Sequence, residues 1–434
     1  MTATSHIPQM NVLIFPSGST VAQEIYDSLK YIKNMKIYGT DFDHSNYSSI
    51  YFENYIPGCP FIKDENATLT FMKKIVDDKH IQYIFPAFDS VIDFLKKNET
   101  NIGAKIICPD LDIIQLCNSK KLTYHRLENI IRTPKIYKKH DITELDFPLY
   151  VKPIIGYGSR NHSILHNMND LENVDENTML LLELLTGDEY TVDCFTDFNG
   201  KLLYNQARQR IRTLNGISIH SKTVCLDTSE IAMKINNEIR MNGPWFFQVK
   251  YSKNNQLTLL EIACRIPGAM CVNRVRGINF CWLSILNSER KTVEPLFYND
   301  IPIECIKMFK NIYRKQIDYD TIYCDLDDTL IIHDKVNIEL IAFLYKSFNN
   351  NKCLHLITRN ADPDSVLKKH KIHIFDSIIK ISNMKDEEGN YIDKKSSYIK
   401  TKSSIFIDDS YVEKLDVSSV CNIHCFSPSE IELL

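Results

Sequence analysis

Three apolar runs in the last quarter of the chain each end in polar side chains, and this arrangement constrains the fold more than any other feature. The runs are TIYCDLDDTL, LHLITRN and SSIFIDDS. Their terminal polar residues are Asp325, Asp327, Thr358, Asp408 and Asp409. In a parallel sheet the carboxyl ends of the strands meet at one edge, and carboxylates gathered there repel one another unless a divalent cation neutralises them. The pattern predicts an α/β domain over residues 318–434 that binds Mg²⁺.

The motif aspartate-x-aspartate-x-threonine at the end of a strand resembles the haloacid-dehalogenase-like (HAD) phosphatases. Over residues 318–434 the motifs of that family follow one another in order. The resemblance implies that Asp325 is the nucleophile that forms an aspartyl-phosphate. It also implies that Asp327 protonates the leaving group and then activates water. Thr358 would bind the transferring phosphoryl group.

The remaining positions of that motif set supply a lysine and the metal ligands. By the same resemblance Lys395 holds the nucleophile and the phosphoryl group, with Lys394 as the alternative. The expected Mg²⁺ ligands are Asp325, Asp327, Asp408 and Asp409. The first and second motifs leave room for only one helix between them. We therefore expect a capless HAD-like domain with an open cleft for a phosphorylated substrate.

The first 115 residues alternate between strand and helix patterns. NVLIFPSG is typical of a short buried strand, and the segment after it carries Val21, Ile25 and Leu29 at helical spacing. Further strands are expected in KIYGTDFD, IQYIFPAFD and AKIICPD. This alternation predicts a Rossmann-like, doubly wound parallel sheet over residues 1–115, with its ligand edge at the carboxyl ends of the strands.

Residues 116–315 are richer in strand patterns. A helix capped by Asn118 or Ser119 and extending to Thr133-Pro134 is expected first. The segment VKPIIGYGSR then joins Lys152, at a strand end, to a glycine-rich turn. Such a turn exposes backbone N–H groups to phosphate, and a neighbouring lysine supplies a mobile positive charge.

Carboxylates further along this region are spaced to serve the rest of a nucleotide. Glu183 ends an apolar strand and Glu189 follows it, so the pair could meet an adenine edge and ribose hydroxyls. The predicted hairpin WFFQVKYSKNNQLTLLEIACR can bring Gln248 and Glu261 side by side as oxygen ligands for Mg²⁺. Arg265 follows Glu261 and could neutralise an acyl phosphate.

A basic run, RQRIR, lies on one of the predicted strands. Period two places Arg208, Arg210 and Arg212 on one face of that strand. We expect Arg208 and Arg210 to bind substrate, and a solvated charged face is the alternative.

Together these features resemble the ATP-grasp superfamily, especially its carbamoyl-phosphate-synthase-like branch, over roughly residues 10–310. Such enzymes carry a strand–helix domain before ATP-grasp α+β lobes. The resemblance implies ATP and Mg²⁺ as cofactors, with Gln248 and Glu261 as metal ligands and Arg265 facing the reacting phosphate. The implied ATP-binding residues are Lys120, Lys152, Gly156, Tyr157, Gly158, Ser159, Glu183, Leu184, Leu185 and Glu189.

Two positions depart from that family pattern. The glutamate-x-asparagine metal motif is EIA in this chain, with Ala263 in place of asparagine. Ser119 occupies the position before the first lysine, where the family usually has aspartate. Because alanine supplies no oxygen ligand, one of two metal sites is expected to be weakened.

Composition narrows the classes of partner. The 434 residues carry a formal charge of -4, so no global basic field favours nucleic acid or an anionic membrane. No apolar run is long enough to span a bilayer, and no secretory signal is evident. The 13 cysteines lack the repeated spacing of a zinc site, although CNIHC comes closest. Reduced thiols in a cytoplasmic protein are therefore expected.

The sequence thus predicts a bifunctional enzyme. Residues 1–315 would form an ATP-dependent ligase that joins a small-molecule carboxylate to an amine through an acyl phosphate. Residues 318–434 would form a Mg²⁺-dependent phosphatase of the same pathway. The alternatives are an ATP-grasp kinase that does not ligate, and a nucleotide-binding sensor or scaffold without turnover, which Ala263 favours. The surface of the front domain is compatible with a homodimer.

Overall fold

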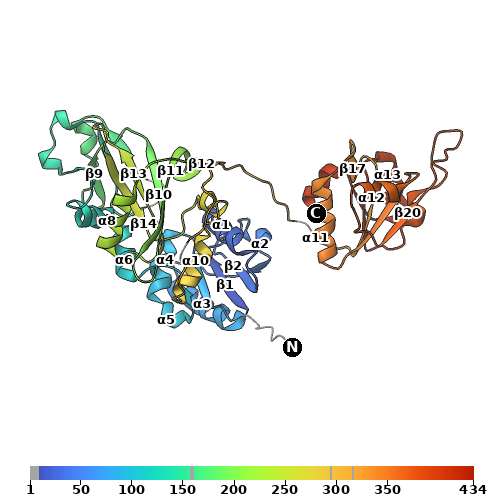
Figure 1. The fold of residues 1–434 in the computed structure, drawn as a ribbon, viewed down its shortest axis with the longest axis horizontal. Helices are drawn as coiled ribbons and strands as arrows, with labels where there is room; N and C mark the ends of the chain where they lie inside the picture. The colour runs from blue at the N-terminus through green and yellow to red at the C-terminus, as the bar shows by residue number, and fades with distance from the viewer. Residues whose placement is uncertain (1–8, 157–160, 294–295, 315–316) are drawn as a thin grey trace. The chain divides into compact units, whose positions relative to one another are not determined.

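The chain forms two compact units, Met1–Phe309 (unit 1) and Lys310–Leu434 (unit 2), shown in Figure 1. The computed structural model describes residues 9–156, 161–293, 296–314 and 317–434. The front sheet and the β-rich region predicted after it both lie in unit 1. The predicted boundaries at residues 115 and 315 remain predictions.

The front of unit 1 is a five-stranded parallel sheet in the order β3-β2-β1-β4-β5. Its strands are β1 (Met10–Phe15), β2 (Met35–Thr40), β3 (Asn54–Ile56), β4 (Tyr83–Pro86) and β5 (Lys105–Ile106). Its helices are α1 (Thr20–Leu29), α2 (Ser48–Tyr51), α3 (Glu65–Lys79), α4 (Asp89–Lys97), α5 (Glu99–Ile102) and α6 (Leu111–Asn118). The expected parallel sheet is therefore present.

The apolar run of strand β1 is continuous because side chains on both of its faces are buried. Val12 and Ile14 are buried in a cluster on one face of the sheet, and Leu13 and Phe15 are buried in a second cluster on the other face. Successive side chains of a strand point to opposite faces, and both faces of this sheet are covered. Where β1 ends, the Ser19 side chain accepts a hydrogen bond from the Ala22 backbone and caps α1.

A smaller antiparallel sheet follows, in the order β6-β9-β7-β8. It is preceded by α7 (Lys120–Leu127), which the Ser119 side chain caps as expected. Its strands are β6 (Ile136–Tyr137), β7 (Leu149–Pro153), β8 (Ser163–Leu165) and β9 (Met179–Glu183), with short 3-10 turns η1 (Lys139–Asp141), η2 (Glu144–Asp146) and η3 (Met168–Leu171). The helix ends at Leu127 and not at Thr133-Pro134, because the backbone of residues 130 and 131 turns back to the Leu127 carbonyl.

The third sheet of unit 1 is antiparallel and six-stranded, in the order β14-β13-β10-β11-β12-β15. Its strands are β10 (Glu189–Thr196), β11 (Leu202–Leu214), β12 (Ile217–Thr223), β13 (Gly243–Tyr251), β14 (Leu257–Ala263) and β15 (Glu304–Ile306). Helices α8 (Ser229–Ile239), α9 (Cys271–Arg274) and α10 (Phe280–Ser288) accompany it. The predicted β13–β14 hairpin is confirmed, and it pairs Gln248 with Glu261.

One hydrophobic core connects the front sheet to the six-stranded sheet. Val12 and Ile14 of β1 share a buried cluster with Phe195 of β10, Tyr204 of β11 and Phe280 of α10. Helix α1 packs against α10. The front sheet is therefore fused to the rest of unit 1 by apolar packing.

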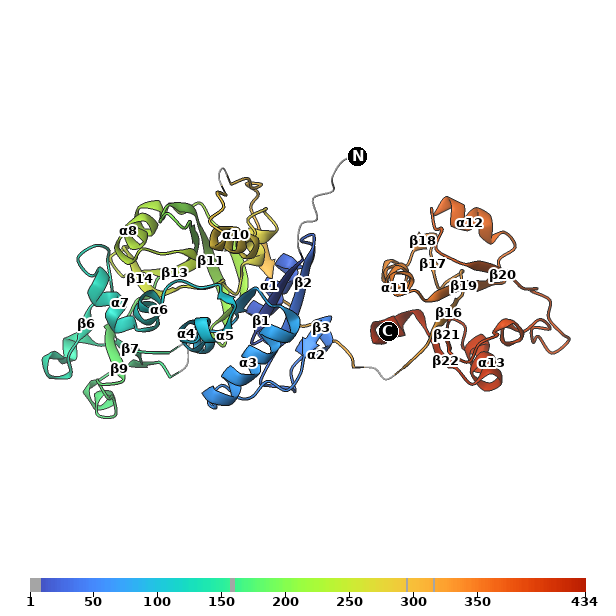
Figure 2. The same cartoon turned by 90° about the horizontal axis from the view of Figure 1, so that it is seen from below.

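Unit 2 is a five-stranded parallel sheet in the order β20-β19-β16-β21-β22, with a small hairpin. Its strands are β16 (Thr321–Cys324), β17 (Ile331–Ile332), β18 (Lys335–Val336), β19 (Cys353–Thr358), β20 (Ser377–Lys380), β21 (Ser404–Ile407) and β22 (His424–Phe426). Its helices are α11 (Ile338–Asn349), α12 (Pro363–Lys369), α13 (Tyr411–Cys421), η4 (Lys395–Tyr398) and η5 (Pro428–Leu433). Figure 2 shows α11 and α13 on opposite faces of the sheet, where each covers its own apolar cluster.

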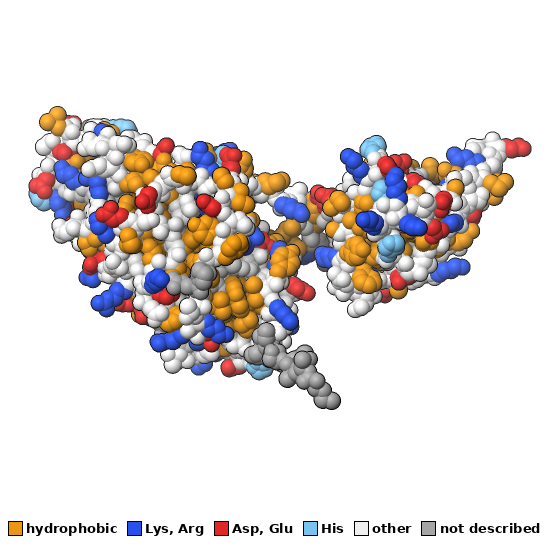
Figure 3. All heavy atoms as spheres, viewed as in Figure 1, with side chains coloured by type: hydrophobic (Ala, Val, Ile, Leu, Met, Phe, Trp, Pro, Cys, Tyr) orange, Lys and Arg blue, Asp and Glu red, His pale blue; other side chains and the backbone are white. Residues whose placement is uncertain are grey.

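The surface carries both signs of charge. Figure 3 shows Lys and Arg side chains interspersed with Asp and Glu on the visible face of each unit. Among the described residues no helix is both long and apolar enough to cross a bilayer.

Candidate functional site

Two buried lysines meet beside β14 in unit 1. Lys120, the first residue of α7, donates from Nζ to the Gly156 carbonyl at 2.6 Å and lies 3.9 Å from Glu261 Oε2. Lys152, in β7, donates from Nζ to the Leu260 carbonyl at 3.0 Å. Both side chains are buried. Ammonium groups from two separate elements thus reach the same stretch of β14.

The environment of Lys152 changes its protonation. Burial lowers the pKa of Lys152 to about 7; the Glu261 carboxylate opposes this shift, and the Lys120 ammonium adds to it. The Lys152 Nζ also lies 5.4 Å from the centre of the Tyr124 ring. A lysine of this kind is only partly charged near neutral pH, and an anion beside it restores the charged form. Strongly shifted lysines are concentrated at functional sites.

Gln248 and Glu261 are direct partners across β13 and β14, so their side chains share one face of the sheet. Glu261 is partly exposed, with 36% of its side-chain surface accessible. Ala263, two residues further along β14, pairs with Phe246 and adds no oxygen to that face. The pair therefore offers two protein oxygen ligands, and a Mg²⁺ ion there would need phosphate or water for the rest of its octahedron.

Arg265 is held by a residue that the sequence analysis did not identify. Its Nε donates to Asp89 Oδ1 at 2.6 Å and its Nη2 to Asp89 Oδ2 at 2.8 Å. Its Nη1 donates to the Ile266 carbonyl at 3.1 Å, and its guanidinium lies 5.3 Å from the centre of the Phe246 ring. Asp89 opens α4 at the carboxyl end of β4. The ligand edge of the front sheet therefore fixes this arginine in a bidentate pair.

The predicted adenine and ribose carboxylates are both paired with arginine. Glu183, at the end of β9, accepts from Arg132 Nη2 at 2.8 and 3.0 Å and from the Lys135 backbone at 3.0 Å. Glu189, at the start of β10, accepts from Arg210 Nη1. Of the other two predicted hinge residues, Leu185 is buried and Leu184 is partly buried.

The three arginines of β11 do not form one regular row. Arg208 is buried and donates to Asp193 at 2.9 and 3.2 Å. Arg210 pairs with Glu189 and donates to the Gly216 carbonyl at 2.7 Å. The pairing of β11 with β12 shifts between Arg210 and Arg212, and Arg212 is exposed. The predicted single face is therefore wrong at Arg212, because a β-bulge breaks the alternation.

Three of the predicted phosphate-loop residues, Tyr157, Gly158 and Ser159, lie outside the described residues. Gly156 is described, and its carbonyl accepts the Lys120 hydrogen bond. The expectation of a phosphate loop therefore rests on its first residue and its sequence.

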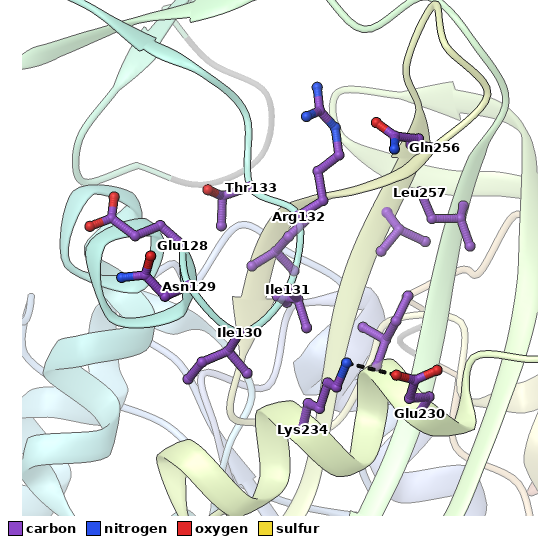
Figure 4. Close-up of a pocket in the computed structure, with 13 residues that line it drawn as sticks. Glu128, Asn129, Ile130, Ile131, Arg132, Thr133, Glu230, Lys234, Gln256 and Leu257 are labelled. Carbon is purple, nitrogen blue, oxygen red and sulfur yellow. Dashed lines mark ion pairs between the residues drawn. The ribbon is translucent and has the colours of Figure 1, made fainter.

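A surface cavity of about 500 Å³ opens between the segment after α7, helix α8 and the β13–β14 hairpin (Figure 4). None of the predicted ATP-binding residues lines it. Lys234 and Glu230 form an ion pair at its wall, and Arg132 lies on its rim. Because Arg132 also binds Glu183, this arginine links the cavity to the predicted adenine hinge.

In unit 2 the predicted charged residues converge at one edge of the sheet. Lys395 Nζ donates to Asp325 Oδ1 at 2.7 Å and to Asp408 Oδ2 at 2.6 Å. One carboxylate oxygen from each of Asp325, Asp408 and Asp409 lies within 4.8 Å of the others. Among the described residues this is the one group of three side chains suited to hold a metal ion. Lys394, the alternative lysine, instead lies 4.0 Å from Asp416.

This cluster is short of positive charge. Burial raises the pKa of Asp325 to about 7; Lys395 opposes the shift and Asp408 adds to it. Burial likewise raises the pKa of Asp408. Three carboxylates gather around the Lys395 ammonium group, and this donor set matches the oxygen ligands that Mg²⁺ prefers. The residues present therefore fit a divalent cation.

Asp327 and Thr358 lie beside this cluster and share a partner. Asn360 Nδ2 donates to both Asp327 oxygens at 2.9 Å, and the Asn360 backbone donates to Thr358 Oγ1 at 3.1 Å. Thr329 Oγ1 donates to Asp409 at 3.1 Å. The sequence analysis missed Asn360, although its position directly after LITR at a strand end was a signal that it could have used.

The residue before Asn360 secures the loop that leads to Lys395. Arg359 donates to Glu413 at 2.7 Å and to the Asp393 carbonyl at 2.8 Å, and its guanidinium lies 3.6 Å from the centre of the Tyr391 ring. Arg359 thus fixes the backbone two residues before Lys395.

Residues 175–303 match the family model described as "ATP-grasp in the biosynthetic pathway with Ter operon". The chain is also similar to solved structures. Biotin carboxylase from Campylobacter jejuni shares 16% identity at a TM-score of 0.56, covering 66% of this chain and 72% of that one. L-amino acid ligase from Bacillus licheniformis shares 16% at 0.53, covering 67% and 78%. N5-carboxyaminoimidazole synthetase from Staphylococcus aureus shares 16% at 0.52, covering 65% and 78%.

No curated protein sequence matches the chain. At these identities the solved structures show likeness of fold alone. The family model and the fold neighbours together support the ATP-grasp superfamily. The matched segment contains Glu183, Gln248, Glu261 and Arg265, whereas Lys120 and Lys152 precede it.

Proposed function

We propose that unit 1 is an ATP-dependent ligase that joins a small-molecule carboxylate to an amine. The observation that carries the proposal is the meeting of Lys120 and Lys152 beside Glu261, on the face of the sheet that also carries Gln248. Two cations from separate elements next to two oxygen ligands suit the phosphates and metal of a bound nucleotide.

Nucleotide and metal are also present among the fold neighbours. The Campylobacter jejuni biotin carboxylase was solved as a β,γ-ATP complex, and the biotin carboxylase domain of Hydrogenobacter thermophilus 2-oxoglutarate carboxylase with MgADP and bicarbonate. For this chain we assign ATP to the predicted nucleotide residues and Mg²⁺ to Gln248 and Glu261. Bound Mg²⁺ would neutralise phosphate charge during transfer.

The chemistry assigned to unit 1 has two steps. The γ-phosphoryl group of ATP passes to an oxygen of the acid, giving an acyl phosphate and ADP. The amine then attacks the acyl carbon, the new C–N bond forms and inorganic phosphate leaves. Lys120, Lys152 and Arg265 would hold the phosphate oxygens, so the protein contributes positioning and charge. Arg208 and Arg210 of β11 are proposed to contact the substrate.

For unit 2 we propose a Mg²⁺-dependent phosphatase acting on a phosphorylated small molecule. The supporting observation is the contact of Lys395 with both Asp325 and Asp408 beside Asp409. Asp325 would attack phosphorus and form an aspartyl-phosphate, while Asp327, oriented by Asn360, would donate and then accept a proton. Bound Mg²⁺ would be held by Asp325, Asp408 and Asp409, which form one group, and by Asp327, the fourth predicted ligand, which lies outside that group.

One experiment separates the ligase from its alternatives. ADP release is measured over pairs of acids and amines with the full chain. A ligase releases ADP and phosphate in equal amounts only when acid and amine are both present. ADP release with a single acceptor and no free phosphate would identify a kinase. Nucleotide binding without ADP release under any pair would identify the sensor that Ala263 favours.

The phosphatase is tested in the same preparation. Hydrolysis of p-nitrophenyl phosphate should require Mg²⁺ and should stop when the ion is chelated. Light scattering on the full chain tests the homodimer.

A further inference from the structure

Two cysteines from separate segments of unit 1 meet side by side. Cys271 opens α9, and Cys305 is the middle residue of β15. Their Sγ atoms are 3.6 Å apart, and both residues are partly exposed. A disulfide bond is about 2.05 Å long, so the two sulfur atoms need to approach by roughly 1.5 Å. Both belong to very short elements, and β15 lies at the edge of its sheet.

Lys307 and Glu24 act on both thiols, whereas Arg208 acts on Cys305. With the Cys271 thiol as donor, the hydrogen bond between the two sulfur atoms lowers the pKa of Cys305 to about 6, with help from Lys307 and Arg208 and against burial and Glu24. The same hydrogen bond raises the pKa of Cys271. A thiolate is the reactive form of cysteine, and a positive setting favours it.

Lys307 supplies a positive charge close to the two thiols. It directly follows β15, two residues after Cys305, and its charge lowers the pKa of both thiols. Its Nζ donates to the Gly268 carbonyl at 2.7 Å, which ties it to the loop that leads into α9. The same loop therefore carries Cys271 and anchors the cation beside Cys305.

We propose that Cys271 and Cys305 form an oxidisable dithiol that reacts with hydroperoxides. The Cys305 thiolate attacks the terminal peroxide oxygen, the O–O bond breaks, and a sulfenic acid forms as the alkoxide or hydroxide leaves. Cys271 then attacks the Cys305 sulfur, its proton goes to the departing hydroxyl group, and water leaves. Two thiols lose two electrons in total, and one peroxide is reduced by two.

The disulfide would tie the edge of the six-stranded sheet to the segment that follows Arg265. Across the sheet, Cys305 of β15 pairs with Ser221 of β12, and Ser221 pairs with Arg210 of β11. The disulfide would therefore form at the β15 end of the row of paired residues that includes Arg210. An effect of oxidation on ATP turnover rests on the proposed ligase, whereas the disulfide itself does not.

The test is peptide mapping of the full chain after brief treatment with hydrogen peroxide and alkylation of the remaining thiols. Trypsin releases Cys271 in IPGAMCVNR and Cys305 in TVEPLFYNDIPIECIK. We expect these two peptides to be joined, and to separate again after reduction. Exposed Cys225 provides the matched control variant Cys225→Ser, which should leave the joined peptide unchanged.

Two further variants, Cys271→Ser and Cys305→Ser, test which thiol reacts first. In Cys271→Ser the sulfenic acid at Cys305 has no thiol to react with, so dimedone should label Cys305. In Cys305→Ser, labelling of Cys271 should be at least about tenfold slower, because burial and Glu24 raise the pKa of its thiol. The proposal is overturned if Cys305 remains free while Cys225 is oxidised, if Cys305 pairs with a different cysteine, or if dimedone labels Cys271 first.

Discussion

The two candidate sites differ in how far their charged residues have already come together. In unit 2, one lysine contacts two aspartates within 2.7 Å; the aspartates follow strand ends, and Lys395 opens η4 in the connection between β20 and β21. In unit 1, Lys120 lies 3.9 Å from Glu261, whereas Glu189 pairs with Arg210 and Arg265 binds the unpredicted Asp89.

The difference follows from topology. In unit 2, β19, β16 and β21 are neighbours in one parallel sheet, so their carboxyl ends deliver side chains to one edge. In unit 1, the residues arrive from a helix start, a four-stranded sheet and a six-stranded sheet. The unit 2 carboxylates therefore gather around one lysine, whereas the unit 1 residues are distributed over several elements.

The sharpest test of this comparison removes the unit 2 nucleophile. Asp325→Asn should lower Mg²⁺-dependent p-nitrophenyl phosphate hydrolysis by a factor on the order of 10⁴ or more, because no aspartyl-phosphate can form. ADP release by unit 1 should be unchanged. The control is Asp364→Asn, which removes an exposed aspartate of the same unit. Loss of ADP release in Asp325→Asn would show that the two sites depend on each other.

In unit 1 the largest effect is expected at Lys152. Lys152→Met should lower ATP-dependent turnover by about 10² to 10³-fold, since one buried cation no longer holds phosphate oxygen. Phosphatase activity should stay at the parent level. Lys253→Met, at an exposed position, is the control for the loss of a lysine. Parent-level ATP turnover in Lys152→Met would remove Lys152 from the nucleotide site.

Asp89 tests whether the front sheet positions the unit 1 site. Asp89→Asn should lower kcat for ADP release by about 10-fold to 10²-fold with little change in KM for ATP, because Arg265 loses its fixed orientation. Asp89→Glu, which keeps a carboxylate, should recover part of the rate. Asp93→Asn, on the same helix, should have no effect. A loss that falls on KM alone would place Asp89 in nucleotide binding.

An added oxygen ligand at position 263 should strengthen Mg²⁺ binding in unit 1. Ala263→Asn places an amide oxygen on the strand face that carries Glu261, two residues away. The Mg²⁺ concentration for half-maximal ADP release should fall several-fold. Ala263→Leu has a similar size without the oxygen and should not show this gain. Equal Mg²⁺ dependence in both variants would mean that position 263 does not face the metal.

The smallest expected effect is the uptake of a fraction of a proton per protein molecule when nucleotide binds. Burial holds the pKa of Lys152 at about 7, below the ordinary 10.5. Phosphate beside Lys152 stabilises its ammonium form and raises this pKa, so nucleotide binding at pH 8 should take up protons. The uptake should disappear well below pH 7, where Lys152 is already charged. Calorimetry in buffers of different ionisation enthalpy measures it, and Lys152→Met should abolish it.

The sequence predicted those parts of the structure that depend on local patterns. The parallel front sheet, the β13–β14 hairpin and the meeting of three strand ends in unit 2 all follow from apolar periodicity and turns. The pairing of Gln248 with Glu261 was predictable because a hairpin fixes the register of its two strands. Of the two candidate lysines, Lys395 contacts Asp325 and Lys394 lies 4.0 Å from Asp416.

Contacts between distant segments were not predictable in this way. Asp89 and Arg265 are 176 positions apart, and neither carries a local signal for the other. The bulge in β11 inserts one residue, and a period-two argument then assigns Arg212 to the wrong face. Helix α7 ends early because the chain turns back at Leu127, although apolar residues continue beyond it.

The hydrophobic core that the front sheet shares with the six-stranded sheet limits where the chain can be truncated or recombined. Val12 and Ile14 share one cluster with Phe195 and Phe280, so a chain that began after the front sheet would expose the apolar face of its six-stranded sheet. Such a truncation should yield insoluble material and not a smaller active protein. Inheritance of the front sheet and the six-stranded sheet as a single block is the expected result.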